Sequence, residues 1–470
     1  MNPLLLALLI YSFILITMGL FLSRRVAHSL DFFVADRKLG PGLLFSTLLA
    51  ANIGAGSTVG AAGLGYQLGL SGWWWVGSAG LGSAILAFVV GPRIRDLAER
   101  WQFLTVGDFL EFRYTRAVRG LSALLLWAGT LAILAGQLIA VAWILEVVVG
   151  TTKSVGCLLG GLVVVVYFSA GGLKGTVWIN LVQLLVKASA FLLAVPLALS
   201  SVGGWSALRR SILEQEAYSQ SYFNLTGIGL EGILAYLVLL VPAFIVSPGL
   251  LQKVYGARSA HAVRIGVGAN AGVLFIYAFF PVLLGMSAAA VFPNLGNPEL
   301  ALPYVMTELL PLWLGALLLA GVFSAEISSA DAVLFMLSTS LSKDLYQTFI
   351  RPDLDGQQLL RMSRYISVVA GVLGVTLAIV LPSVISALTI FYSLISVTFF
   401  APVVLGLYCS GRGGSCLAVI IISVVATALI HVITAGSGIW ILSPTALGIL
   451  LSLLLMSLGM AWSRATAQQS

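Results

Sequence analysis

Charged side chains are scarce in this sequence. Only 9% of its 470 residues are Asp, Glu, Lys or Arg, whereas 60% are hydrophobic. Soluble globular proteins carry about 25% charged residues, so this composition argues against a soluble enzyme. Apolar runs of about 20 residues, long enough to cross a bilayer as helices, recur along the whole chain. The sequence therefore predicts an all-α integral membrane protein.

Cysteine and histidine are also rare, with three residues of each. Cys157, Cys409 and Cys416 lie in or beside apolar runs, and neither residue type shows metal-ligand or disulfide spacing. No nucleophile and base stand at a catalytic spacing. We therefore expect no enzymatic activity, no cofactor and no transition metal. The net charge of +7 follows a membrane topology, so we expect no nucleic acid and no obligatory protein partner.

The first apolar run is a retained helix in this interpretation, because Arg24 and Arg25 follow it, whereas a signal peptide carries its positive charge in front. We predict thirteen transmembrane helices over residues 3–22, 41–70, 72–91, 118–149, 154–170, 173–200, 228–254, 262–292, 303–340, 361–381, 383–408, 414–434 and 443–461.

Lysine and arginine are distributed asymmetrically between the predicted loops. With an outside N-terminus, all of the 24 except Lys153, Lys187, Arg209 and Arg210 fall on the cytoplasmic side. Positive residues gather in cytoplasmic loops, and shifting the count by one helix would destroy the asymmetry. We therefore predict a multi-pass protein of the plasma (cytoplasmic) membrane with its C-terminus in the cytoplasm.

Two predicted helices carry breaks at matching places. One contains Asn52–Thr58, which is rich in glycine, and the other contains Val246-Ser247-Pro248-Gly249. Matched breaks in two five-helix blocks are typical of inverted-repeat transporters with discontinuous helices; the alternative is that Gly and Pro merely loosen two helices. The predicted divisions are a leading helix (1–30), a first repeat (31–202), an extracellular loop (203–227), a second repeat (228–410), and two C-terminal helices with a short tail (411–470).

Several short segments, in their order and spacing, resemble the sodium:solute symporter family of sodium/glucose, proline, pantothenate and sialic-acid symporters. They are Asp31–Ala35, Ala50–Ile53, Leu104–Tyr114, Ala170–Lys174, Pro248–Lys253, Ser328–Asp331 and Lys343–Tyr346. The resemblance implies the inverted five-plus-five helix architecture with broken helices 1 and 6, the LeuT-like fold.

A sodium site is expected where the first broken helix meets the span 303–340. Ala325, Ser328, Ser329 and Ala332 share one face of that span at 100° per residue, and sodium prefers oxygen ligands. The family resemblance implies the carbonyls of Ala50, Ile53 and Ala325 and the hydroxyls of Ser328 and Ser329. The alternative is that both serines bond back to their own helix.

Ionisable residues inside membrane spans are functional candidates, and Lys187, Glu326 and Asp331 are three of them. Asn180 stands where several family members have an Asp of a second sodium site. Asp331 with Asn180 could hold a second cation, or Asp331 could pair with a basic group, which we favour. For Lys187 we favour a buried ion pair over substrate contact, and over replacement of sodium by its ammonium.

The solute pocket is expected between the two broken helices. Its candidate residues are Ser57, Thr58, Gln137, Phe244, Ser247, Tyr392 and Ser393. Taken alone, each is better explained by helix packing or helix–helix hydrogen bonding than by contact with the solute. A sugar needs many hydrogen-bonding groups, so this apolar pocket favours an amino acid or a monocarboxylate. Trp73-Trp74-Trp75 is interpreted as an anchor at the outer membrane interface.

The sequence thus predicts a secondary active transporter that couples a small organic solute to Na⁺ by alternating access. Its expected partners are the lipid bilayer, the solute and Na⁺ as coupling ion. A first alternative is a proton-coupled transporter that uses Lys187, Glu326 and Asp331. A second is a transporter-like sensor, although only about nine residues follow the last predicted span, which leaves no room there for an output domain.

Overall fold

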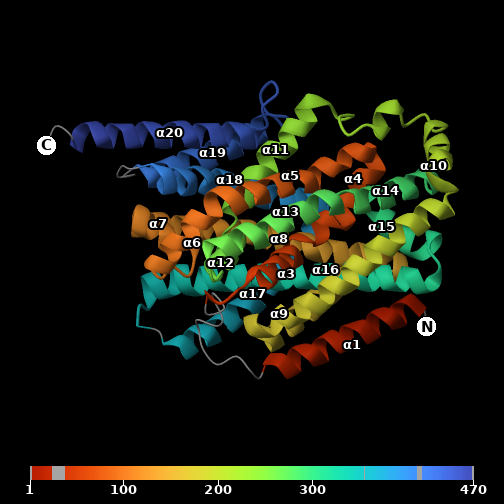
Figure 1. Cartoon of the computed structure of the whole chain (residues 1–470), viewed down its shortest axis with the longest axis horizontal. Coiled ribbons are helices and arrows are strands. Elements are labelled where there is room, and N and C mark those ends of the chain that lie inside the picture. The colour runs from red at the N-terminus through yellow and green to blue at the C-terminus, as the bar shows by residue number, and fades with distance from the viewer. Residues whose placement is uncertain (1–2, 24–36, 354, 410–414, 468–470) are drawn as a thin grey trace.

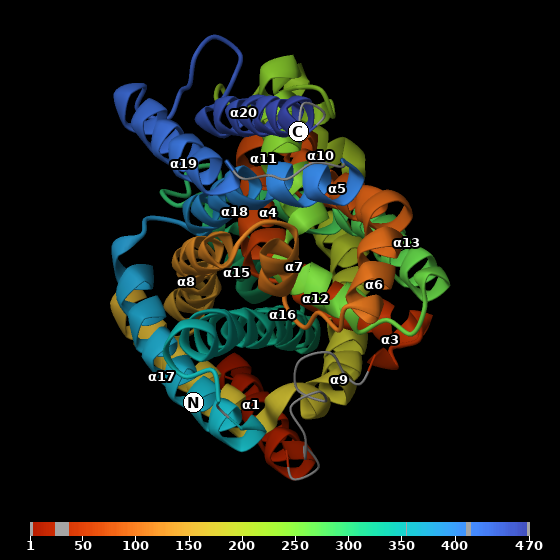
Figure 2. The same cartoon turned by 90° about the vertical axis from the view of Figure 1, so that its left-hand side faces the viewer.

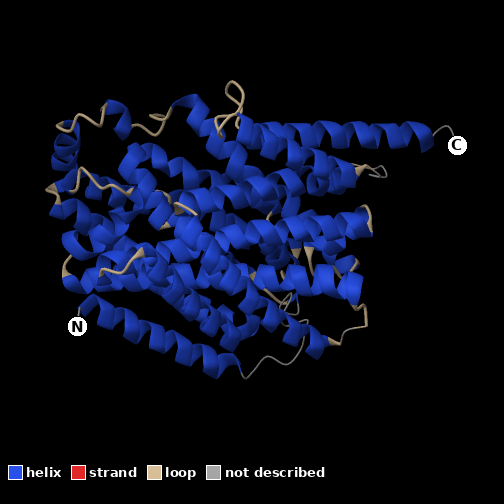
Figure 3. Ribbon diagram, turned by 180° about the vertical axis from the view of Figure 1, so that it is seen from behind, coloured by secondary structure: helices blue, strands red, loops and turns tan. Residues whose placement is uncertain are grey.

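The computed structural model describes residues 3–23, 37–353, 355–409 and 415–467. Side chains are not described at 15–16, 18–23, 166–181, 356, 360 and 464–467. The described chain is almost wholly helical and contains no β-strand (Figure 3). Most helices run along the long axis, so the molecule is a bundle (Figure 1). The predicted all-α class is therefore confirmed; the segment Asp31–Ala35 lies outside the described residues.

The helices begin and end as follows: α1 Pro3–Ser23, α3 Pro41–Asn52, α4 Val59–Leu68, α5 Trp73–Ile85, α6 Gly91–Arg100, α7 Val106–Arg113, α8 Arg116–Val149, α9 Lys153–Ser201, α10 Gly204–Leu213, α11 Gly229–Val246, α12 Pro248–Tyr255, α13 Ala260–Tyr277, α14 Phe279–Val291, α15 Ala301–Tyr304, α16 Leu312–Thr339, α17 Gly356–Val380, α18 Val384–Tyr408, α19 Cys416–Ile433 and α20 Pro444–Ala467. A π-helix, η8 (Ser340–Ile350), continues α16.

Several helices start at a side chain that accepts a hydrogen bond from the first turn. Thr115 caps α8, Ser259 caps α13, and Ser383 caps α18. These side-chain oxygens satisfy backbone amides that have no partner within the helix. The caps show why the apolar runs are divided into helices at these positions.

In one region the structure corrects the predicted division. The predicted spans 154–170 and 173–200 form one helical element, α9, of 49 residues. Its described ends pack on different neighbours, because Gly160 lies against Val141 of α8 whereas Lys187 bonds to Ser328 of α16. Within the described residues ten helices are long and apolar enough to span a membrane. The count of thirteen and the domain boundaries stay predictions.

Helix α16 lies in the middle of the bundle, among α8, α9, α12 and α17 (Figure 2). The contact between α16 and α9 is the most extensive between any two elements of the described structure. Nearly all of α16 from Gly321 to Thr339 is buried. The serine pair and both carboxylates of this helix therefore lie deep inside the protein. By contrast α19 and α20 pack at the periphery, while the described ends of α1 and α20 lie at opposite ends of the bundle (Figure 1).

A network of charges joins α7, α8 and η8. The Arg119 guanidinium contacts Asp344 at 2.7 Å, Glu111 at 2.7 Å and Asp108 at 3.0 Å, while Lys343 contacts Asp108 at 3.1 Å. Asp108 also accepts the backbone amide of Leu104. This network connects the far end of the α16–η8 element to the α7–α8 turn.

Candidate functional site

The first predicted break is present in the structure. Helix α3 ends at Asn52 and α4 begins at Val59. Between them the Gln137 carboxamide oxygen accepts the Ala55 amide at 2.9 Å, and the Ser57 hydroxyl contacts the Gly54 amide at 3.0 Å. These side chains replace helical hydrogen bonds that the unwound turn has lost. A Cβ at Gly54 would overlap the Ser329 hydroxyl and the Gln137 oxygen, so only glycine fits there.

The second break separates α11 from α12 at a single residue, Ser247, whose ψ angle is 120°. Proline at 248 explains it, since a proline lacks an amide hydrogen and pushes the residue before it into extended backbone. Gly249 packs against the side chain of Met336 on α16. Both breaks therefore lie beside the buried part of α16.

The structure brings together all five oxygens predicted to bind sodium. Ser328 Oγ lies 3.0 Å from the Ala50 carbonyl and 3.1 Å from the Ala325 carbonyl. Ser329 Oγ lies 3.4 Å from the Ala50 carbonyl and 3.2 Å from the Ile53 carbonyl. Ligands at ~2.4 Å around a six-coordinate cation of this size stand about 3.4 Å apart. Small adjustments of these oxygens would therefore enclose a sodium ion.

Lys187 reaches one of these oxygens, the Ser328 hydroxyl, from α9. Its ammonium donates to Ser328 Oγ at 3.1 Å, and the side chain is only 1% exposed. Among the residues that the structure describes, it makes no ion pair within 4.0 Å. The Glu326 charge nevertheless acts on Lys187 without direct contact, so the favoured buried ion pair of Lys187 with Glu326 or Asp331 stays a prediction.

Glu326 lies on the same buried helix and is fully shielded from solvent. One carboxylate oxygen accepts the Thr58 hydroxyl at 2.7 Å, and the other has no hydrogen-bond partner among the described residues. Thr58 also bonds to the Gly54 carbonyl. Glu326 is thereby tied to the start of α4, and its negative charge acts on the ammonium of Lys187.

Asp331 and Asn180 are not brought together by any described contact, since the side chain of Asn180 lies outside the described residues. Asp331 lines a cavity instead, where the charge that acts on it belongs to Lys253 of α12. The basic group acting on Asp331 is therefore Lys253, and the favoured role of Asp331 as the structural partner of a basic group stays a prediction.

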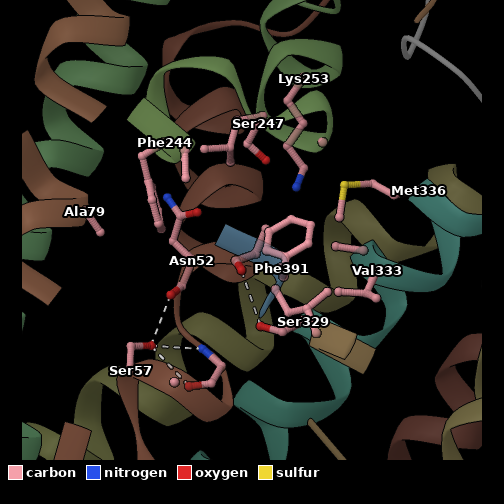
Figure 4. A pocket seen from close by; sticks show the side chains of 18 of the residues that line it. Asn52, Ser57, Ala79, Phe244, Ser247, Lys253, Ser329, Val333, Met336 and Phe391 are labelled. Atoms are coloured by element: carbon pink, nitrogen blue, oxygen red, sulfur yellow. Dashed lines mark hydrogen bonds between the residues drawn. The ribbon is translucent and has the colours of Figure 1, made fainter. Parts of the chain in front are cut away.

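A cavity lies between the two breaks. Five of the predicted solute contacts line it: Ser57, Gln137, Phe244, Ser247 and Tyr392. Figure 4 shows Asn52 between Phe244 and Phe391, with Ser247 and Lys253 above them. Two predicted contacts do not line it. Thr58 is fully buried against Glu326, and Ser393 faces Thr445 of α20 at 2.6 Å, so helix packing turns both away.

An aromatic cluster lines the cavity near the start of α5. Tyr392 is in ring contact with Trp75 at 5.9 Å, with Phe244 at 5.7 Å and with Phe391 at 5.3 Å. Trp75 also meets the ring of Tyr236 at 5.8 Å and is only 3% exposed. The interpretation of Trp75 as a membrane-interface anchor is therefore wrong, because its indole packs inside the protein.

Sequence reasoning missed Lys253, Asn52 and Trp75 as cavity residues. A signal for Lys253 was available: it stands six residues after Ser247, within two turns of the second break. A long lysine side chain can reach back over that distance. At the other end the cavity extends to Leu39 and Gly256, where α3 begins and α12 ends.

Comparison with known proteins supplies the family. A model of the sodium:solute symporter family matches residues 32–415, most of the chain. The chain belongs to that family. This symporter is a multi-pass membrane transporter and not an enzyme. Na⁺-coupled transport of a solute is the function that the family supports, which agrees with the expectation from the sequence.

Relatives of this symporter carry different solutes. It is 28% identical to the sodium/pantothenate symporter of Escherichia coli (strain K12), with 80% of this chain and 79% of that protein covered. It is 25% identical to the sodium/glucose cotransporter of Vibrio parahaemolyticus, with 78% and 73% covered. These relatives establish the class of transport and leave the solute undecided.

Solved structures show the fold. The symporter resembles a Na⁺-coupled sialic acid symporter in a substrate-bound outward-open state, with a TM-score of 0.80 at 18% identity over 98% of both chains. A nucleobase-cation-symport-1 family transporter matches with a TM-score of 0.60 at 16% identity, over 93% of this chain and 95% of the other. These similarities over nearly the whole chain confirm the predicted LeuT-like fold.

Proposed function

We propose that this symporter couples the entry of an amino acid or a monocarboxylate to sodium by alternating access. The observation that carries the proposal is the convergence of the Ala50, Ile53 and Ala325 carbonyls on the hydroxyls of Ser328 and Ser329. A sodium ion bound there joins α16 to the unwound turn after α3. Because that turn also lines the cavity, sodium binding and solute binding stabilise one another.

In this proposal the structure represents the inward-facing state of the transport cycle. With the predicted topology, the aromatic cluster around Tyr392 covers the outer side of the cavity, and Leu39 and Gly256 lie toward the cytoplasm. The inverted repeats and the orientation of the termini belong to the same proposal. One positive charge moving inward through 100 mV releases roughly 2.3 kcal/mol, which supports an accumulation of about fiftyfold.

Uptake into liposomes tests this function. Purified symporter is reconstituted and supplied with radiolabelled amino acids and monocarboxylates, with and without an inward sodium gradient. Sodium-driven accumulation above the outside concentration is expected, and it should collapse when an ionophore dissipates the sodium gradient. Accumulation that ignores sodium and disappears with the proton gradient would reject sodium coupling.

Proton coupling is the second candidate, and the contact between Lys187 and Ser328 favours it. An ammonium in this position supplies the positive charge that sodium would otherwise bring to the same oxygens. Loss of its proton would then release the joint between α9 and α16. Uptake that needs an inward proton gradient and disappears in Lys187→Met would support this candidate over the first.

A further inference from the structure

Two opposite charges line the cavity. They are the ammonium of Lys253 on α12 and the carboxylate of Asp331 on α16. Asp331 is 7% exposed, yet among the described residues neither side chain makes a hydrogen bond or an ion pair within 4.0 Å. Neither belongs to the polar atoms that burial closes off. Both charges can therefore be reached from the cavity.

An unpaired charge inside a membrane protein is costly, so this arrangement requires an explanation. Each of the two charges stabilises the other electrostatically. They do so across a gap wider than a contact ion pair. A ligand that carries both signs could insert into such a gap and satisfy both groups with charge-assisted hydrogen bonds.

The remaining cavity wall indicates what else the ligand carries. Phe244, Phe391 and Tyr392 supply aromatic surface, and Trp75 adds to it near the start of α5. Figure 4 shows Lys253 reaching toward the space beside Phe391 and Met336. A wall of this kind favours an apolar group over a hydroxylated one. The charges and the aromatic wall thus match two different ends of one molecule.

We propose that the solute is an α-amino acid with an apolar side chain, with Lys253 binding its carboxylate and Asp331 its ammonium. This inference rests on the proposed function, because it names the solute that the sodium-coupled cycle carries. It selects the amino acid over the monocarboxylate, which would leave Asp331 without a partner. It also assigns Asp331 to the solute and not to a second cation.

The test uses four compounds that share an isobutyl group and the thermal unfolding midpoint of the purified full-length symporter at one sodium concentration. Leucine has both charges, leucinamide lacks the carboxylate, 4-methylpentanoate lacks the ammonium, and 3-methylbutylamine is a plain amine. Leucine should raise the midpoint and bind at least tenfold more tightly than the other three. Lys253→Gln should abolish the preference for leucine over leucinamide. Asp331→Asn should abolish its preference over 4-methylpentanoate.

Arg209→Gln and Asp96→Asn remove charges of the same signs outside the cavity and should leave all four affinities unchanged. If a single variant does not fold, the double variant Lys253→Gln/Asp331→Asn leaves neither charge alone, and it should bind all four compounds equally weakly. Equal binding of leucine and 4-methylpentanoate to the wild type would overturn the inference, as would no binding of any compound. A sodium titration without solute separates the two levels: a midpoint that rises with sodium while leucine has no effect rejects this inference and leaves sodium coupling standing.

Discussion

The ammonium nitrogen of Lys187 lies 3.1 Å from the hydroxyl oxygen of Ser328. The same hydroxyl lies 3.0 Å from the Ala50 carbonyl, one of the oxygens proposed to bind sodium. The Lys187 ammonium and the proposed sodium ion would thus share the Ser328 hydroxyl as a ligand. The occupancy of this site by sodium must depend on where the ammonium points and on whether it is protonated.

Removal of the Lys187 charge should strengthen sodium binding. In Lys187→Met the repulsion between ammonium and sodium is lost, so the sodium concentration for half-maximal uptake should fall at least tenfold, which corresponds to about 1.4 kcal/mol. Sodium-dependent uptake in liposomes measures this. Because the change leaves Glu326 without its opposite charge, Lys187→Met/Glu326→Gln serves as the matched control. An unchanged sodium requirement in both variants would show that Lys187 does not compete with the ion.

Loss of the two hydroxyls should weaken sodium dependence. Ser328→Ala with Ser329→Ala removes two of the five proposed ligands, and at roughly 1 kcal/mol for each hydrogen-bonding group sodium affinity should fall by one order of magnitude or more. Ser338→Ala is the matched control, since Ser338 is a buried serine of α16 whose hydroxyl donates to the Phe335 carbonyl in its own helix. Sodium titration of uptake separates the two variants; equal sodium affinities would remove the site assignment.

Gln137 should be required to hold the unwound turn. Gln137→Leu leaves the buried amide of Ala55 without its acceptor, which costs roughly 1–3 kcal/mol. Uptake should drop about tenfold or more, and the unfolding midpoint should fall. Gln183→Leu is a suitable comparison, because both polar atoms of Gln183 are buried without a partner in the described structure, and its loss should not destabilise the protein. Equal effects of the two substitutions would contradict a specific role of Gln137.

Asp108 should stabilise the protein at neutral pH and lose this effect in acid. Burial alone would raise the pKa of this carboxyl, but Lys343, Arg119 and the amides of Leu104 and Thr105 outweigh burial and hold the pKa below its ordinary value. A lowered pKa in the folded state adds stability above the unfolded value of about 3.9. That stability disappears as the pH falls through the folded value.

Comparison of the wild type with Asp108→Asn measures this contribution. The variant removes the carboxylate that Lys343 and Arg119 share, while Arg119 keeps its contacts with Asp344 and Glu111, so at pH 7 it should be less stable by roughly 3 kcal/mol. The difference should shrink as the pH is lowered below about 4, where unfolded aspartate is protonated. Glu111→Gln, at the more exposed end of the network, should have a smaller effect. A difference that is constant with pH would contradict the ionised form of Asp108.

Much of the architecture could be predicted without coordinates, because hydrophobic run length and backbone chemistry are local properties. Glycines at 54 and 56 and proline at 248 indicated where two helices are interrupted, and the structure has both breaks at these positions. The spacing of Ala325, Ser328 and Ser329 along one helix is local in the same sense. These residues therefore meet the oxygens of the first break as expected.

The partners of the buried charges could not be predicted in this way. Lys187 and Ser328 are 141 positions apart, and their contact depends on the rotation of α9 against α16. The same holds for Lys253 and Asp331, which face one cavity from two helices. Thr58 and Ser393 lie beside predicted cavity residues in the chain, yet packing turns them toward Glu326 and Thr445.

The sequence by itself determined that this chain crosses a membrane as helices and where two of those helices break. It also determined which serines are candidate ligands of a cation. Apolar length, proline and glycine decide these features within a few residues of chain. Only the tertiary structure decided that Lys187 reaches Ser328 and that Lys253 and Asp331 face the cavity. The physical reason is that the direction of a side chain depends on how its helix is rotated against neighbours distant in sequence, which no local pattern records.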